Sequence, residues 1–146
     1  MNETDGLLAP ETPEEARAAY EAVGPTAQVV TKEVAKAMGL GREEYRERVT
    51  GEVIATARDA LFASLLEVQG GSLEEFERWR EAYDGECELL GSENVDRAVW
   101  HAFDGRAVAA TYQNEPEAAR GTLRRQAFGR FYRPLFEGEA NDARTP

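Results

Sequence analysis

Residues 95–112 read VDRAVWHAFDGRAVAATY, and they predict the centre of the fold. Two runs of apolar and aromatic residues flank Asp104-Gly105. An Asp-Gly pair between two such runs is the strongest short-range signal for a two-residue β-hairpin. If these two residues form the turn, the register pairs His101 with Val108 across the two strands.

Both faces of this hairpin are apolar, although a half-exposed antiparallel sheet alternates apolar with polar residues. Either helices of the same chain cover both faces, or the face around the tryptophan meets a second chain. We expect a symmetric homodimer, and a monomer sandwiched by its own helices is the alternative. The possible interface consists of Ala98, Trp100, Ala102, Ala107 and Ala109, while the opposite face carries Val95, Val99, His101, Phe103, Val108, Ala110 and Tyr112.

The segments next to the hairpin carry helix and strand signals. Ser72 followed by Glu75 has the spacing of a capping box, which marks the start of a helix. Gly70-Gly71 closes the apolar run before it, and residues 91–94 have the composition of a four-residue turn. We therefore expect a strand over 65–69, a helix over 72–83, a strand over 86–90 and a last helix over about 115–136.

The N-terminal half has the periodicity of helices. Thr12 with Glu15 three residues later predicts a helix start, and Gly24-Pro25 predicts its end. Gly39 is expected to end the second helix. We therefore expect helices over about 13–23 and 26–38, the second with Ala27, Val30, Val34 and Met38 on one face, and a longer helix from Arg42.

The sequence thus predicts an α+β fold, with N-terminal helices followed by β-α-β-β-β-α and a mainly antiparallel sheet. With 146 residues, no internal repeat and no linker, residues 1–146 are expected to form a single domain. We expect an ordered core over about 7–136, preceded by a flexible acidic lead and followed by a flexible tail at 137–146.

The composition argues against several classes of protein. The longest apolar run, residues 60–66, is far too short to span a membrane, and the acidic first twenty residues lack the apolar region of a signal peptide. A cytoplasmic location follows as the expectation. One cysteine and one histidine cannot supply a structural zinc site, which needs four ligands, and we expect no metal and no cofactor.

The charge balance is strongly acidic. The chain has 28 acidic and 17 basic residues, a formal net charge of −11, and its only lysines are Lys32 and Lys36. Such a surface suits a cytosol of molar salt, where charges are screened over about 3 Å. We expect a halophilic source; an ordinary acidic bacterial protein with biased codon usage is the alternative.

Against this background, RGTLRRQAFGRFYRP at residues 120–134 carries five arginines and no acid. On an ideal helix Arg120 and Arg124 project into the apolar stripe, whereas Arg125 and Arg130 lie outside it. A guanidinium that faces a core must be paired, best with a carboxylate. We therefore expect an internal clamp or a protein interface; contact with RNA or the ribosome, and binding of a small anion, are the alternatives.

Cys87 and His101 are the obvious candidates for nucleophilic chemistry. If residues 91–94 form the turn, Cys87 pairs with Ala98, which places Cys87 on the tryptophan face and His101 on the other. We therefore interpret both as structural residues and predict no catalytic residue. A small-anion site or an enzyme around His101, Arg120 and Arg124 is the least favoured alternative.

Residues 31–49 are similar in spacing to a DNA-binding helix-turn-helix, with Ala35 and Gly39 at the small positions. The would-be recognition helix REEYRER carries three acids, which repel phosphate. Five phosphate contacts would also lose on the order of five decades of affinity between 0.2 M and about 3 M salt. Nucleic-acid binding by this pair or by the C-terminal arginines is therefore possible but disfavoured.

Several segments, among them QVVTKEVAKAM, REEYRERVTGEV, ARDALFASLL, VWHAFDGRAVAATYQNE and TLRRQAFGRFYR, resemble a small haloarchaeal protein family catalogued as a domain of unknown function. The resemblance covers about Leu7 to Phe136. It implies a halophilic source and the extent of the domain, but it brings no activity, ligand or catalytic residue.

These observations favour a non-enzymatic cytosolic module for protein interaction or assembly, whose partner is a second copy of itself or another protein. The first alternative is a nucleic-acid-binding regulator or ribosome-associated protein, and the second is a small-anion-binding protein or enzyme.

Overall fold

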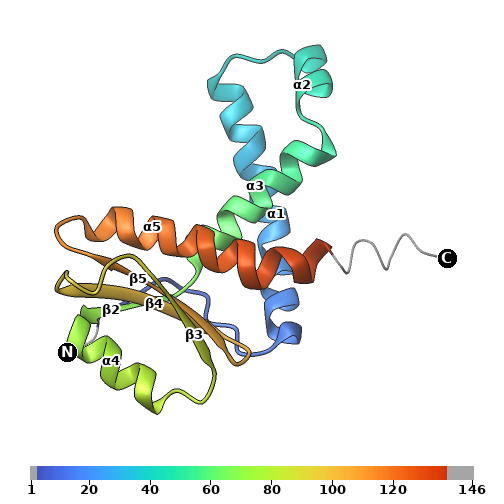
Figure 1. Ribbon diagram of the computed structural model, residues 1–146. Helices are drawn as coiled ribbons and strands as arrows, with labels where there is room; N and C mark the ends of the chain where they lie inside the picture. The colour runs from blue at the N-terminus through green and yellow to red at the C-terminus, as the bar shows by residue number, and fades with distance from the viewer. Residues whose placement is uncertain (1–2, 138–146) are drawn as a thin grey trace.

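The hairpin lies at the centre of a five-stranded sheet in a computed structural model that describes residues 3–137. The strands stand in the order β1-β2-β4-β5-β3, and the described pairs are antiparallel except β3 with β5 (Figure 1). Together with the helices this is an α+β fold, as predicted. The strands are β1 (Glu3–Asp5), β2 (Val68–Ser72), β3 (Glu86–Leu90), β4 (Arg97–Phe103) and β5 (Arg106–Tyr112).

The predicted hairpin register is confirmed. β4 and β5 pair from Phe103 with Arg106 onward, so that His101 lies opposite Val108. Asp104 and Gly105 both have positive φ, at +50° and +81°. A two-residue turn of this kind matches the twist of its strands, which is why the Asp-Gly pair predicts it so well.

Residues 91–96 connect β3 to β4, but the two strands do not pair with each other, so the predicted pairing across this turn was wrong. β3 pairs with β5, where Cys87 lies opposite Ala107 rather than Ala98. The reason is competition for strand edges. β2 pairs with one edge of β4, placing Gln69 opposite Trp100, and β5 takes the other edge. β3 therefore adds to the outside of β5.

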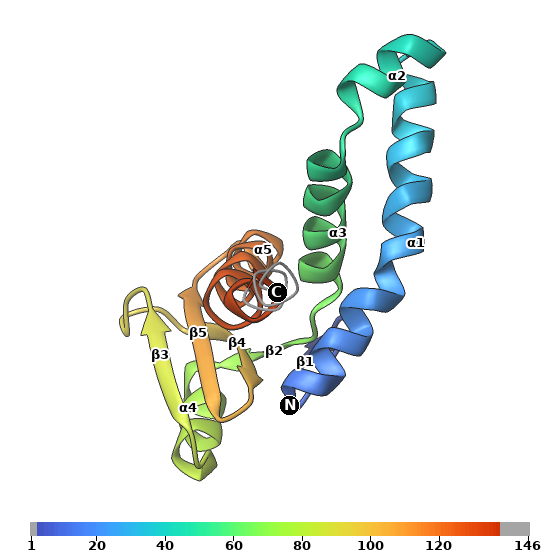
Figure 2. The ribbon, with the colours of Figure 1, turned by 90° about the vertical axis from the view of Figure 1, so that its right-hand side faces the viewer.

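Helices of the same chain cover both faces of the sheet (Figure 2). Helix α4 (Leu73–Ala82) lies over the tryptophan face, and helix α5 (Pro116–Ala127) with the π-helical turn Phe128–Tyr132 lies over the opposite face. The predicted capping box is present in α4, since the Ser72 and Glu75 side chains each accept from the other's backbone N–H. Two apolar clusters therefore lie on either side of one sheet.

Helix α1 (Pro13–Ala37) runs through Gly24-Pro25, which was expected to end it, and it bends along its length (Figure 2). Proline removes a hydrogen bond from the helix interior. Next to the bend, Arg58 of the facing helix donates from Nε to the Tyr20 carbonyl oxygen at 2.9 Å, and its guanidinium lies 4.1 Å from the Tyr20 ring centroid. The Tyr20 hydroxyl donates to Asp59 at 2.6 Å, which ties the bend to the facing helix.

The longer helix predicted from Arg42 is divided in two. Helix α2 (Arg42–Arg48) ends before Val49, and helix α3 (Gly51–Leu65) begins after Thr50, whose hydroxyl accepts from the Val53 N–H. Leu65 therefore belongs to α3, and the strand predicted over 65–69 begins only at Val68.

Two segments were predicted to be flexible: the acidic lead before the ordered core and the tail at 137–146. Within the acidic lead, Glu3–Asp5 forms the edge strand β1 beside β2. Apart from Glu137, the tail predicted at 137–146 lies outside the described residues. No helix in the described range 3–137 has the length and apolar character to cross a membrane.

The outer part of α1, all of α2 and the first turns of α3 rise away from the sheet as a separate arm (Figures 1 and 2). We define the arm as residues 26–57 and refer to the rest of the described chain as the body. The arm has one narrow buried stripe, formed by Ala27, Thr31 and Ala35 of α1.

Candidate functional site

The two arginines predicted to face the core are paired with acids of the same chain. Arg124, whose side chain is only 15% exposed, donates from Nε to the Leu66 carbonyl oxygen at 2.8 Å and from Nη2 to the Asp5 carboxylate at 2.9 Å. The hydrogen bond from Arg124 lowers the pKa of Asp5. Arg120 Nη2 lies 3.7 Å from the Glu3 carboxylate. Both guanidiniums therefore fasten β1 to α5.

The outer arginines make less extensive contacts. Arg130 pairs with the Glu88 carboxylate of β3 and donates to the Gln126 side-chain oxygen at 3.1 Å. Arg125 is exposed, and its Nη2 donates to the Thr122 hydroxyl at 3.3 Å. The arginines thus act mainly between elements of the chain, which is the geometry expected of an internal clamp.

His101 is a buried histidine with both ring nitrogens in use. Nδ1 lies 2.6 Å from the Glu67 carbonyl oxygen, and Nε2 lies 2.7 Å from the Tyr132 hydroxyl. A carbonyl oxygen can only accept, so Nδ1 carries the proton, and neutral Nε2 accepts from Tyr132. Burial lowers the pKa of His101, which favours this neutral form. The arrangement is typical of a histidine that fixes packing.

Cys87 and the predicted tryptophan interface lie on the other side of the sheet. Cys87 is half-buried against the cluster formed by Phe76, Ala98 and Trp100, and burial raises the pKa of its thiol. His101 contacts Tyr132 on the opposite side, so the two do not form a dyad. Of the residues offered as an interface, Trp100, Ala98, Ala107 and Ala109 are buried and Ala102 is half-buried, so α4 already occupies that face.

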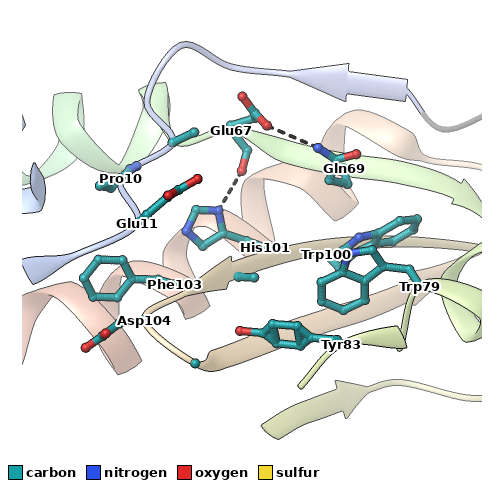
Figure 3. A pocket seen from close by; sticks show the side chains of 13 residues that line it. Pro10, Glu11, Glu67, Gln69, Trp79, Tyr83, Trp100, His101, Phe103 and Asp104 are labelled. Carbon is teal, nitrogen blue, oxygen red and sulfur yellow. Dashed lines mark hydrogen bonds between the residues drawn. The ribbon is translucent and has the colours of Figure 1, made fainter. Parts of the chain in front are cut away.

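A cleft of about 530 Å3 opens beside His101, between the start of α1, the end of α4 and the hairpin turn (Figure 3). Its origin is the short overlap of β2 with β4. Their pairing ends at Gln69 and Trp100, so β4 continues beyond its neighbour as far as Phe103. Trp79, Tyr83 and Trp100 lie together at one end of the cleft, and Glu11, Glu67 and Asp104 lie toward the other end, with His101 (Figure 3).

The arm carries a second candidate surface. Large hydrophobic side chains are exposed at six described positions, and all but Leu7 lie on the arm. Val30, Val34 and Met38 follow one another at four-residue spacing along α1, with Val34 52% and Met38 66% exposed. We call Val30, Val34, Met38 and Val53 the arm stripe. The sequence placed the first three on one face, but no described element covers them.

The arm also has a hollow of about 560 Å3 between the end of α1 and α2. Its cations are Lys32, Lys36, Arg42 and Arg46, and Leu40 and Tyr45 supply apolar surface. Over residues 26–57 five basic residues balance five acidic residues, so the arm has no net charge and the remaining residues carry the whole −11. The basic set is Lys32, Lys36, Arg42, Arg46 and Arg48, and the acidic set is Glu33, Glu43, Glu44, Glu47 and Glu52.

Sequence reasoning missed several residues of these sites. Trp79 lies in α4 and Tyr83 directly follows it, but nothing in the local sequence indicated that they border a cleft. Glu11 and Tyr132 gave no signal, because their partners lie far away in the sequence.

Within residues 3–137, no three His, Cys, Asp or Glu side chains are grouped closely enough to hold a metal ion.

Comparison with known proteins gives a family but no activity. The model of a family of unknown function, DUF5809, matches residues 7–133. No curated protein and no solved structure matches the chain.

Proposed function

Because the chain belongs to this family of unknown function, which supplies no activity, we propose its role from the structure: a non-enzymatic assembly module that pairs with a second copy of itself through the arm. The observation that carries this proposal is the exposed arm stripe. Four large apolar side chains lie in water on a helix pair that rises away from the body.

The arm of a second copy would cover the arm stripe. Two helices share a single interface, so each retains apolar surface that its partner cannot reach. Packing two such pairs gives a four-helix bundle, in which all helices bury an inner stripe. A two-fold axis brings the same residues together from both copies, so that Val34 of each arm contacts the stripe of the other. Burying one valine or methionine contributes about 1.5–3 kcal/mol.

The distribution of charge favours this part of the chain for self-association. Two bodies repel each other, because all of the formal −11 lies outside residues 26–57. Two arms carry no net charge, and their cations and acids can alternate across a two-fold axis. The acid-rich composition also supports a cytoplasm of high salt as the setting, where a Debye length of about 3 Å reduces the remaining repulsion.

The proposed dimer contact lies on the arm and not on the tryptophan face, where the sequence predicted it. Trp100 and its alanine neighbours pack under α4, so a dimer through them would require α4 to leave. The arm needs no such rearrangement.

Nucleic-acid binding is the second candidate, and the hollow with Lys32, Lys36, Arg42 and Arg46 is the observation that favours it. Two features weigh against it. α2 has seven residues, which is short for a helix that reads a groove. Glu43, Glu44 and Glu47 lie on the same helix and repel phosphate.

The test is the mass of the protein in molar KCl, by sedimentation equilibrium at micromolar concentration. The wild type is expected at twice the chain mass of 16.2 kDa. Replacing Val30, Val34 and Met38 together by serine is expected to give the single-chain mass, because it removes the apolar stripe from exposed positions. Leu7→Ser is the matched control, since Leu7 is 82% exposed but lies outside the arm.

Two results would contradict the proposal: a wild type that sediments as a single chain, or a triple variant that dimerises as tightly as the wild type. Fluorescence anisotropy with a labelled DNA duplex and a labelled RNA hairpin in the same buffer tests the second candidate. Binding that Lys32→Glu with Arg42→Glu abolishes would favour nucleic acid over self-association.

A further inference from the structure

We propose that the cleft beside His101 binds a small organic cation, an alkylated ammonium or a guanidinium whose molecule also carries an oxygen that can accept a hydrogen bond. The cleft lies in the body, so this inference is independent of self-association through the arm.

The lining of the cleft is negatively charged. Glu11, Glu67 and Asp104 border the cleft, and no lysine or arginine is among the residues that line it. Figure 3 shows the Glu11 side chain extending from its segment toward His101. Because burial keeps His101 neutral at pH 7, it does not offset these carboxylates. An anion would meet three negative charges here, whereas a cation is attracted.

An aromatic wall lies at the other end of the cleft from the carboxylates. Trp79 and Tyr83 stack with ring centroids 4.7 Å apart, and Trp79 lies 5.8 Å from Trp100. Electron-rich rings attract cations, and tryptophan does so most strongly. Alkylated ammonium and guanidinium groups lose less hydration at such a wall than a metal ion does, which is why aromatic cages select organic cations.

Trp100 carries an unused hydrogen-bond donor. Trp100 is fully buried, and its Nε1 has no hydrogen-bond partner among the described residues. A buried donor without a partner costs about 1–3 kcal/mol, and Trp100 belongs to the lining of the cleft. Nε1 is itself buried, so a ligand oxygen that accepts from it has to displace the side chains that cover it. This requirement distinguishes an amino alcohol from a simple tetraalkylammonium ion.

The volume of about 530 Å3 fits a small molecule rather than a folded partner. Choline has both required groups, a quaternary ammonium and a hydroxyl. L-argininamide has a guanidinium and an amide oxygen. These two compounds therefore serve as probes of the proposed class.

The experiment is a titration followed by intrinsic fluorescence, because the only two tryptophans of the chain, Trp79 and Trp100, both line the cleft. Choline or L-argininamide is expected to give a saturable change. The uncharged analogue 3,3-dimethyl-1-butanol, which has the shape of choline, is expected to bind about tenfold more weakly. Ethyltrimethylammonium, which lacks the hydroxyl, is expected to bind about three- to tenfold more weakly than choline.

Two variants locate the site. Glu11→Gln is expected to weaken binding about threefold to tenfold, because it removes one carboxylate from the cleft. Glu14→Gln is the matched control, since Glu14 is also exposed but does not line the cleft. Trp79→Leu is expected to weaken binding about tenfold while Trp100 still reports it. Glu11 is exposed, so its variant keeps the test independent of any loss of folding at Trp79.

Three results would overturn the proposal: no saturable change with either probe, equal affinity for choline and its uncharged analogue, or equal weakening by Glu11→Gln and Glu14→Gln. Equal affinity for choline and ethyltrimethylammonium would overturn the role given to Trp100. The arm variant that lacks Val30, Val34 and Met38 is expected to bind the probes as the wild type does, which separates this inference from the proposed assembly.

Discussion

The body and the arm use similar residues in opposite ways. In the body, Phe62, Val108 and Tyr132 are fully buried, because helices lie on both sides of the sheet. In the arm, Val30, Val34 and Met38 face water, because two helices can cover only one stripe of each other. Whether an apolar residue is buried therefore depends on the elements packed around it, and not on the apolar periodicity of its own segment. The body supplies its own covering layers, whereas the arm leaves apolar surface exposed to water.

The largest expected effect lies in the body. Phe62 is the hub of its aromatic cluster, with ring centroids at 5.1 Å from Tyr132 and 5.2 Å from Phe136. Phe62→Ala leaves a cavity between three elements and is expected to lower the free energy of unfolding by about 3–5 kcal/mol. Urea denaturation in molar KCl measures it. A loss below about 1 kcal/mol would show that the body is not the tightly packed region.

The next effect concerns the arginine clamp that closes the body. Arg124→Ala leaves the Leu66 carbonyl oxygen and Asp5 without their donor. We expect a loss of about 1–3 kcal/mol in the free energy of unfolding. Arg125→Ala is the neighbouring control and is expected to change it by less than about 0.5 kcal/mol, because Arg125 is exposed. Equal effects would contradict the clamp.

The features predicted correctly from the sequence depend on neighbouring residues, whereas those predicted wrongly depend on distant ones. The hairpin at Asp104-Gly105 and the capping box at Ser72 were predicted correctly, because both depend on residues a few positions apart. The end of a helix at Pro25 was predicted wrongly: α1 continues past the proline, and Arg58 of another helix contacts Tyr20 beside the bend. Local signals cannot report such a distant contact.

The same limit applies to the sites. The strand order depends on β2 occupying an edge of β4, which no residue near β3 reveals. The cleft brings Glu11 together with Trp79 and Trp100, which are far apart in the chain. The periodicity of the arm stripe was visible, but periodicity does not say what covers a stripe. Pairing of Arg124 with an acid was expected from its position on α5, although the identity of that acid was not.

A smaller effect is expected at the hydrogen bond between Tyr132 and His101. Tyr132→Phe removes the donor to Nε2 and is expected to lower the free energy of unfolding by about 1 kcal/mol at pH 7. The pH dependence follows from the lowered pKa of His101. Below about pH 6.5 His101 binds a proton in the unfolded chain but stays neutral in the folded chain. The free energy of unfolding therefore falls as the pH falls.

The variant His101→Gln separates this contribution from that of the carboxylates, because it removes the titrating ring. Urea denaturation between pH 7.5 and 5.5 is expected to show a smaller loss of stability on acidification for His101→Gln than for the wild type. Parallel curves would mean that His101 takes up its proton equally well in both states, contrary to its burial.

The smallest expected effect tests the arm directly. Val34→Ala and Val108→Ala remove the same atoms, but Val34 is 52% exposed and Val108 is fully buried. In dilute protein, where self-association is absent, Val34→Ala is expected to change the free energy of unfolding by less than about 0.5 kcal/mol. Val108→Ala is expected to cost about 2 kcal/mol or more, because it leaves a cavity.

If Val34→Ala weakens dimer formation at high concentration while leaving the dilute chain unchanged, the arm stripe stabilises an assembly rather than the fold. A cost at Val34 equal to that at Val108 would mean that the arm is packed within its own chain.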